Sequence, residues 1–187
     1  MHPAGTSVDY RITYLAMRAR PGYDWPSVPA NPVPASLLRA VDPPVWYFRA
    51  LYDAVGRDHA WEDLQDAPDT DLEGFLADPG VSLWSLIRGG WPQGFFILDA
   101  RDAEKTQITL LGLVPQTVGL GYGRYIVRTA VLTAWERPGL QRLVIDTCSL
   151  DHPRALAVYQ QAGFEVTGTE DRSRVLRHDI DPGRWAP

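Results

Sequence analysis

Three alternating glycines, Gly119, Gly121 and Gly123, constrain the fold of this chain more than any other feature. They follow the apolar run 106–114 and open a segment, 121–136, whose apolar residues recur at helical spacing. Glycine allows positive φ angles and lets a ligand approach the backbone closely. The free N–H groups at a helix start, together with the helix dipole, attract anions such as a pyrophosphate. The pattern therefore predicts a strand, a tight anion-binding turn and a helix.

Glycine-rich turns occur in several kinds of nucleotide-binding site, and two of these fit poorly here. No Gly-Lys-Ser/Thr sequence follows the glycines, so the turn is not a P-loop. The spacing is G-x-G-x-G and the preceding strands read as a meander, whereas a dinucleotide fingerprint opens a βαβ unit. On the glycines alone, a tight strand-to-helix turn without a ligand stays open as an alternative.

The remaining pattern predicts an α/β protein with a mixed, mostly antiparallel sheet flanked by helices. Residues 19–44 hold seven of the sixteen prolines and predict a long loop. Without internal repeats or a composition shift, residues 1–187 are expected to form a single domain. Strands are predicted at 8–18, 81–88, 93–100, 106–114, 140–148, 164–169 and 174–178, and helices at 45–56, 71–77, 121–136 and 153–162.

Composition excludes several classes of protein. The 45% hydrophobic content supports a packed core, and the net charge of −5 argues against a nucleic-acid partner. One cysteine, Cys148, excludes an intramolecular disulfide and favours a cytoplasmic protein. No apolar run approaches the roughly 20 residues of a membrane span, so no membrane partner is expected. The histidines lack ligand spacing, so no metal is expected; they are His2, His59, His152 and His178.

A second motif makes the interpretation specific. The segment 151–164 reads DHPRALAVYQQAGF and lies about thirty residues after the glycine turn. Together the two segments resemble the GNAT family of acyl-CoA-dependent N-acetyltransferases, whose turn is written Q/R-x-x-G-x-G/A and whose closing helix is written N-x-x-A-x-x-x-Y-x-x-x-G-F. Ala155, Tyr159, Gly163 and Phe164 fall on marked positions of the helix. The chain is thus identified as a bacterial member of that family, and the resemblance covers 110–164.

Two positions depart from the family pattern. Val118 stands where glutamine or arginine is usual, although a shifted match beginning at Gln116 also exists. Backbone N–H groups do most of the phosphate binding, so Val118 is compatible with a donor site. His152 stands where asparagine is usual; it either hydrogen-bonds the pantetheine arm or simply starts the helix.

The resemblance implies that acetyl-CoA is the acyl donor and that 106–164 form its binding core. The 45–77 helices would then shape the acceptor side, with Tyr47, Tyr52 and Trp61 as candidate lining residues. Arg154 would meet the 3′-phosphate of CoA or be an ordinary exposed arginine. The residues implied for donor binding are Leu113, Val114, Val118, Gly119, Leu120, Gly121, Tyr122, Gly123, Arg124, His152, Arg154 and Tyr159.

The resemblance also implies direct transfer within a ternary complex, with Tyr159 as the general acid that protonates the departing thiolate. Asp146 and Glu62 are the leading candidates for the general base, and Asp63 is a third. Cys148 invites a covalent alternative, but direct transfer favours a buried strand cysteine.

The expected function is acetyl transfer to a primary amine, carried by a small molecule or by a peptide or protein. The sequence does not choose among these acceptors. Two alternatives remain: a non-catalytic acyl-CoA-binding or sensing module, and an acyltransferase that uses a longer acyl-CoA. Proteins of the family are often dimers, so a homodimer is a candidate assembly.

Overall fold

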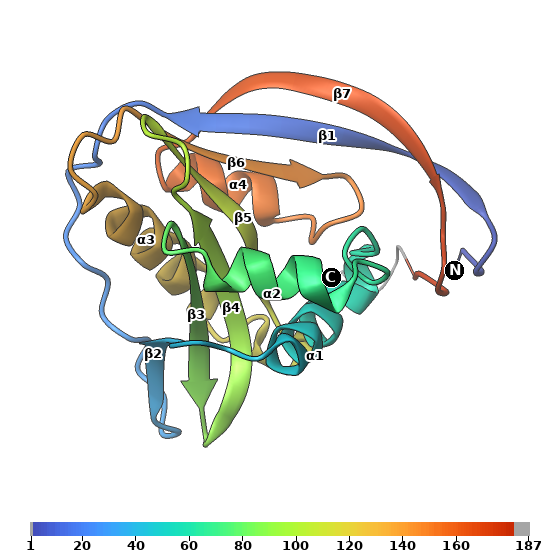
Figure 1. Ribbon diagram of the computed structural model, residues 1–187, viewed down its shortest axis with the longest axis horizontal. Helices are drawn as coiled ribbons and strands as arrows, with labels where there is room; N and C mark the ends of the chain where they lie inside the picture. Colours follow the sequence, from blue (N-terminus) through green and yellow to red (C-terminus); the bar gives the residue numbers. More distant parts are fainter. Residues whose placement is uncertain (1, 182–187) are drawn as a thin grey trace.

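A computed structural model describes residues 2–181, in which one seven-stranded sheet has helices on both faces (Figure 1). The strand order is β2-β3-β4-β5-β6-β1-β7, and every neighbouring pair is antiparallel except β5 and β6. This confirms the predicted mixed, mostly antiparallel α/β sheet. The strands are β1 Ser7–Met17, β2 Ala35–Arg39, β3 Val81–Arg88, β4 Trp91–Asp99, β5 Lys105–Leu113, β6 Arg142–Cys148 and β7 Glu165–Val175.

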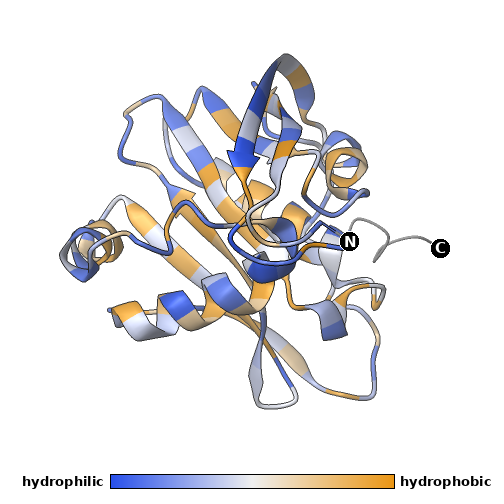
Figure 2. Ribbon diagram, turned by 90° about the vertical axis from the view of Figure 1, so that its right-hand side faces the viewer, coloured by the Kyte–Doolittle hydropathy of each residue, from blue (hydrophilic) through white to orange (hydrophobic). Residues whose placement is uncertain are grey.

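The helices are α1 Val45–Gly56, α2 Asp69–Ala77, α3 Tyr122–Trp135 and α4 Ala155–Gln161, with short 3₁₀ turns η1 Arg57–His59 and η2 Pro115–Thr117. Two apolar clusters pack helices against the sheet. One joins α3 and α4 to the sheet around Phe96, Ile126 and Leu143, and the other joins α1 to β3 and β4 around Phe48 and Phe95. Figure 2 shows hydrophobic residues concentrated in the central strands.

Three predicted details are wrong. The Pro-rich stretch 19–44 contains a strand, β2, which pairs antiparallel with β3 at the edge of the sheet. The two predicted closing strands are one strand, β7, because it pairs with β1 along its length and is interrupted only by a register shift. Gly56 does not cap α1 in the left-handed region; its φ is −86°, and the left-handed residue is Ala60.

Strand β1 has an unexpected place. Although it comes first in the sequence, it lies inside the sheet, where Thr13 pairs with Thr147 of β6 on one side and with Thr169 of β7 on the other. Figure 1 shows β1 and β7 running together as a long curved ribbon across the top of the molecule. The N-terminal strand β1 therefore lies between β6 and β7 and pairs with both of them.

The Pro-rich segment then crosses the outside of α3. Tyr23 lies against Arg128 of α3, with the guanidinium carbon 4.5 Å from the ring centroid, and its hydroxyl donates to the carbonyl of Ala162 at 3.2 Å. Pro29 approaches the glycine turn, 3.8 Å from where a Cβ on Gly121 would lie. The Pro-rich segment 19–44, called the Pro-rich strap below, thus contacts α3, the residue after α4 and the glycine turn.

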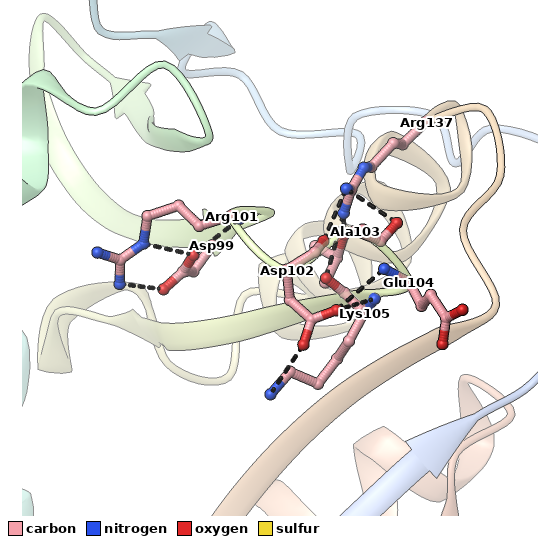
Figure 3. Close-up of polar contacts among 8 residues, drawn as sticks. Asp99, Arg101, Asp102, Ala103, Glu104, Lys105 and Arg137 are labelled. Atoms are coloured by element: carbon pink, nitrogen blue, oxygen red, sulfur yellow. Dashed lines mark hydrogen bonds and ion pairs between the residues drawn. The ribbon is translucent and has the colours of Figure 1, made fainter.

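Arg137, just after α3, binds the turn before β5 and the start of that strand (Figure 3). Its guanidinium donates to the carbonyls of Asp102, Ala103 and Lys105 at 2.7, 3.1 and 3.1 Å. The carbonyl of Glu104 accepts the N–H groups of Gln141 and Arg142 at 3.0 and 3.1 Å. We call this set of hydrogen bonds the Arg137 clamp.

Candidate functional site

Beyond the Arg137 clamp, β5 and β6 separate. Their parallel pairing is limited, within the described chain, to Lys105–Gln107 of β5 against Arg142–Val144 of β6. The β4–β5 register shifts after this point, because Ile97 pairs with Leu110 and Leu98 with Ile108. This bulge increases the local bend of β5. The gap between 108–113 and 145–148, called the split below, opens the middle of the sheet.

The glycine turn, predicted to bind an anion, follows β5 and the short 3₁₀ turn η2. Gly119 and Gly121 each have φ of 86°, a conformation that L side chains rarely adopt, and Gly121 is the residue that precedes α3. No side chain caps α3, so the first N–H groups of this helix point outward without an intrahelical partner. A Cβ placed on Gly119 or Gly123 would meet no atom within 4 Å, so the backbone is accessible at these positions.

The side chains of the turn differ in what they offer. Arg124 is exposed and Leu120 is 40% exposed, so both can meet a ligand. Tyr122 is fully buried beside Tyr125, and its hydroxyl has no hydrogen-bond partner. The side chain of Tyr122 is therefore inaccessible to acetyl-CoA, whereas Val118 is half-buried and its N–H donates to the carbonyl of Pro115 at 3.3 Å.

Leu113 and Val114 were expected to position the thioester through their backbones. The N–H of Val114 donates to the carbonyl of Gln93 at 3.1 Å, and its carbonyl accepts from Thr117 at 2.9 Å. Leu113 pairs with Gly94 of β4. The backbone N–H and carbonyl of Val114 are thus already hydrogen-bonded to Gln93 and Thr117, and a role of Leu113 or Val114 in binding the acyl donor stays a prediction.

Tyr159 comes from α4, which packs against the same cluster as β6. Its side chain is buried, and it lies near the edge of the Phe164 ring. Burial raises the pKa of the phenol far above its usual value, and the negative charges of Asp151 and Asp146 raise it further. The phenol therefore stays protonated through neutral pH, which is the form that a general acid requires.

His152 makes a local hydrogen bond just before α4, a helix without a side-chain cap hydrogen bond. Nδ1 of His152 accepts the N–H of Arg154 at 3.1 Å, so His152 does organise the helix start. Burial, with repulsion from His59 and Arg154, lowers the pKa of His152 and keeps the imidazole neutral near pH 7. Arg154 is exposed. Contacts of either residue with pantetheine or phosphate stay predictions.

Asp151 was missed by sequence reasoning. One carboxylate oxygen accepts the indole N–H of Trp61 at 3.1 Å, and the other accepts the Thr147 hydroxyl at 2.7 Å and the Cys148 N–H at 2.8 Å. It therefore joins the end of β6 to the loop after η1. The family pattern marks no carboxylate at this position, so only the fold reveals its role.

Cys148 lies at the end of β6, next to this carboxylate. Burial and the negative charge of Asp151 raise the pKa of its thiol to about 12. The reactive thiolate is then scarce at neutral pH. This argues against a covalent acyl-enzyme at Cys148.

The candidate bases have different surroundings. Asp146 is exposed to solvent, yet loss of hydration raises its pKa, and the charge of Asp151 adds to this effect. Glu62 is buried and accepts the backbone N–H of Arg177 at 2.7 Å, and exposed Asp63 pairs with Arg174. Asp146 is the candidate whose charge acts on Tyr159.

The three aromatic residues expected at the acceptor side lie at different depths. Trp61 reaches β5, where its ring atoms lie 3.4 and 3.8 Å from the position of a Cβ on Gly112. Tyr52 lies behind it, with ring centroids 5.7 Å apart. The Tyr47 hydroxyl donates a hydrogen bond to the Ser85 hydroxyl of β3 at 2.8 Å. Trp61 is therefore the one of these three that reaches the split.

Comparison with known proteins identifies the family. The sequence profile of the acetyltransferase (GNAT) family matches residues 48–164. The chain belongs to the GNAT family. No curated protein matches the sequence significantly.

Solved structures agree on the fold. A GCN5-related N-acetyltransferase from Sphaerobacter thermophilus aligns with a TM-score of 0.61 at 16% identity, over 96% of this chain and 54% of that one. One from Kribbella flavida gives 0.58 at 20% identity, over 87% and 56%. The chain thus spans about half the length of these two relatives. A GNAT acetyltransferase from Elizabethkingia anophelis with acetyl-CoA bound gives 0.51 at 19% identity, over 72% and 78%.

Among residues 2–181, no helix is both long and apolar enough to cross a membrane. Within the same residues, no three His, Cys, Asp or Glu side chains gather as a metal site would require.

Proposed function

We propose that this protein is an N-acetyltransferase that moves the acetyl group of acetyl-CoA directly onto a primary amine. The observation that carries the proposal is the split, which begins where β5 and β6 stop pairing at Gln107 and Val144. On one side of the split β5 leads toward the glycine turn, and on the other side β6 is followed by α4, which carries Tyr159. The pyrophosphate of the donor fits the turn, and the thioester then falls in the opened sheet.

The chemistry proposed at the split is a single displacement. The neutral amine attacks the thioester carbonyl carbon, a C–N bond forms and the C–S bond breaks. Tyr159 donates its proton to the departing CoA sulfur, and the amine loses a proton to Asp146, directly or through water. The raised pKa of Asp146 suits a base near neutral pH, because its conjugate acid holds the proton more firmly.

The acceptor is proposed to be an amine of a small molecule, a peptide or a protein. The relative from Elizabethkingia anophelis, which holds acetyl-CoA, supports the donor. Another solved structure that aligns with this chain, an aminoglycoside acetyltransferase in complex with sisomicin, makes aminoglycosides the first amines to screen.

The test is release of CoA thiol from acetyl-CoA in the presence of an amine panel, followed by mass spectrometry of the acetylated product. We expect turnover that requires both substrates and forms no acyl-enzyme. Tight acetyl-CoA binding without turnover across a broad panel would support a sensing module instead. Faster turnover with octanoyl-CoA than with acetyl-CoA would support the longer-chain alternative.

A further inference from the structure

Trp61 is placed by an unusual approach of the chain. After α1 and η1, Ala60 adopts a left-handed φ of 55° and redirects the backbone. The indole then packs on Gly56, where a Cβ would lie only 2.4 Å from the Trp61 Cβ. A side chain at position 56 would displace the indole, so the glycine is needed for this contact.

The other end of the indole reaches both arms of the split. A Cβ on Gly112 of β5 would lie 3.4 Å from the Trp61 Cη2 atom. The indole N–H donates to Asp151, three residues after the end of β6. Trp61 therefore spans from β5 to the loop that follows β6.

The position of the indole is fixed from several sides. The Asp151 carboxylate is itself held by the Thr147 hydroxyl and the Cys148 N–H. The Tyr52 and Phe95 rings lie behind the indole, at centroid distances of 5.7 and 6.2 Å. An aromatic ring with a held hydrogen-bond partner and two ring neighbours has little freedom to swing away.

The space over Gly112 is also filled from α1. A Cβ at this position would come within 2.3 Å of the Cγ1 atom of Val55. Val55 and Trp61 together therefore cover β5 where it borders the split, on the face that carries α1. An acyl chain that continued past the thioester on this face would meet both side chains.

We propose that Trp61, held by Asp151, closes this face of the split and limits the acyl donor to short chains. This rests on the proposed function, because it assumes that the thioester lies in the split. Trp61 is then a specificity-determining residue for the donor, and Asp151 is the residue that positions it. The family motif assigns neither role.

The test is calorimetric binding of CoA, acetyl-CoA and butyryl-CoA to the whole chain and to Trp61→Ala. Butyryl-CoA has two more methylenes than acetyl-CoA. Each methylene that gains an apolar site improves binding about fourfold, which corresponds to about 0.8 kcal/mol. We expect the wild type to bind acetyl-CoA at least about as well as butyryl-CoA. The alanine variant should shift the ratio toward butyryl-CoA by about tenfold.

Two further variants make the result decisive. Trp46→Ala removes a tryptophan that is 69% exposed at the other end of α1, and it should leave the ratio unchanged. Trp61→Leu keeps an apolar side chain beside Gly56 but vacates the space at Gly112, so it replaces the alanine variant if that protein fails to fold. Circular dichroism establishes folding before binding is compared.

The outcomes separate the two proposals. If CoA and acetyl-CoA bind but the chain-length ratio is the same in the wild type and the folded Trp61 variants, the inference is overturned and the proposed function stands. The same holds if the wild type already prefers butyryl-CoA. If no CoA species binds the folded wild type, the proposed function fails, and the inference fails with it.

Discussion

Tyr159 is the proposed general acid of the site. Its buried, protonated phenol predicts that Tyr159→Phe lowers kcat for acetyl transfer by about 100-fold, because general-acid catalysis contributes at least that much. The KM for acetyl-CoA should change little, since the ring remains. Steady-state kinetics check this, with Tyr125→Phe as a matched buried tyrosine on α3. An equal loss in both variants would assign Tyr159 to packing.

Asp146 predicts a pH-dependent cost to stability. Its pKa is raised in the folded protein, so the folded state binds the proton more tightly than the unfolded state does. Ionisation therefore costs stability as pH rises through the unfolded pKa, and the loss persists above the folded pKa. We expect Asp146→Asn to raise the Tm at pH 7.5, with the gain vanishing near pH 4.

Thermal unfolding at the two pH values measures this difference, and Asp24→Asn provides an exposed control on the Pro-rich strap. The same Asp146→Asn protein should lose acetyl transfer, because the candidate base is gone. If Asp146→Asn leaves the Tm unchanged or lowers it at pH 7.5, the ionised carboxylate does not destabilise the folded protein.

The sequence predicted single residues correctly where a residue type meets a requirement of the local backbone. Gly119 and Gly121 adopt the positive φ that the pattern predicted. The same reasoning could not find Asp151, because its partners come from the loop after η1 and from β6, far apart in sequence. Nor could it show that the Val114 backbone is already hydrogen-bonded, since that depends on Gln93 in a neighbouring strand.

At the scale of elements, the Arg137 clamp lies at the end of β5 that still pairs with β6, just before the split. We predict that Arg137→Ala lowers the free energy of unfolding by about 2 kcal/mol, since several hydrogen bonds from one charged group are lost near the surface. Chemical denaturation measures this, with Arg39→Ala on exposed β2 as the control. Arg137→Lys should recover only part of the loss, because an ammonium lacks the planar fork of a guanidinium.

Local periodicity predicted α1 and α3 almost to the residue, because each carries an apolar stripe that packs on one cluster. It failed for β7, where exposed residues alternate only weakly and pairing with β1 decides the strand. It also failed for β2, a five-residue edge strand between prolines that exists because β3 offers it a partner. Short edge strands carry too few residues for a periodic signal.

For the whole molecule, the placement of β1 matters most. The prolines after it predicted a long connection, but nothing local indicated that the first strand would lie between β6 and β7. That arrangement depends on distant partners in the chain, for example Met17 with Leu143 and Ile12 with Cys148 of β6. The candidate site depends on this placement of β1. Beyond Val144, β6 no longer pairs with β5, and its pairing with β1 keeps it in the sheet.

A proline substitution tests whether β1 is an interior strand. Thr13 has strand partners on both sides, so Thr13→Pro removes a ladder hydrogen bond inside the sheet, at a cost of about 3 kcal/mol or more. Ser36→Pro makes the same change in β2, which has a partner on one side only, and should cost less. Thr13→Val keeps a β-branched residue and should fold normally. Equal destabilisation by the two prolines in denaturant unfolding would contradict an interior β1, and with it the account of how β6 is held at the split.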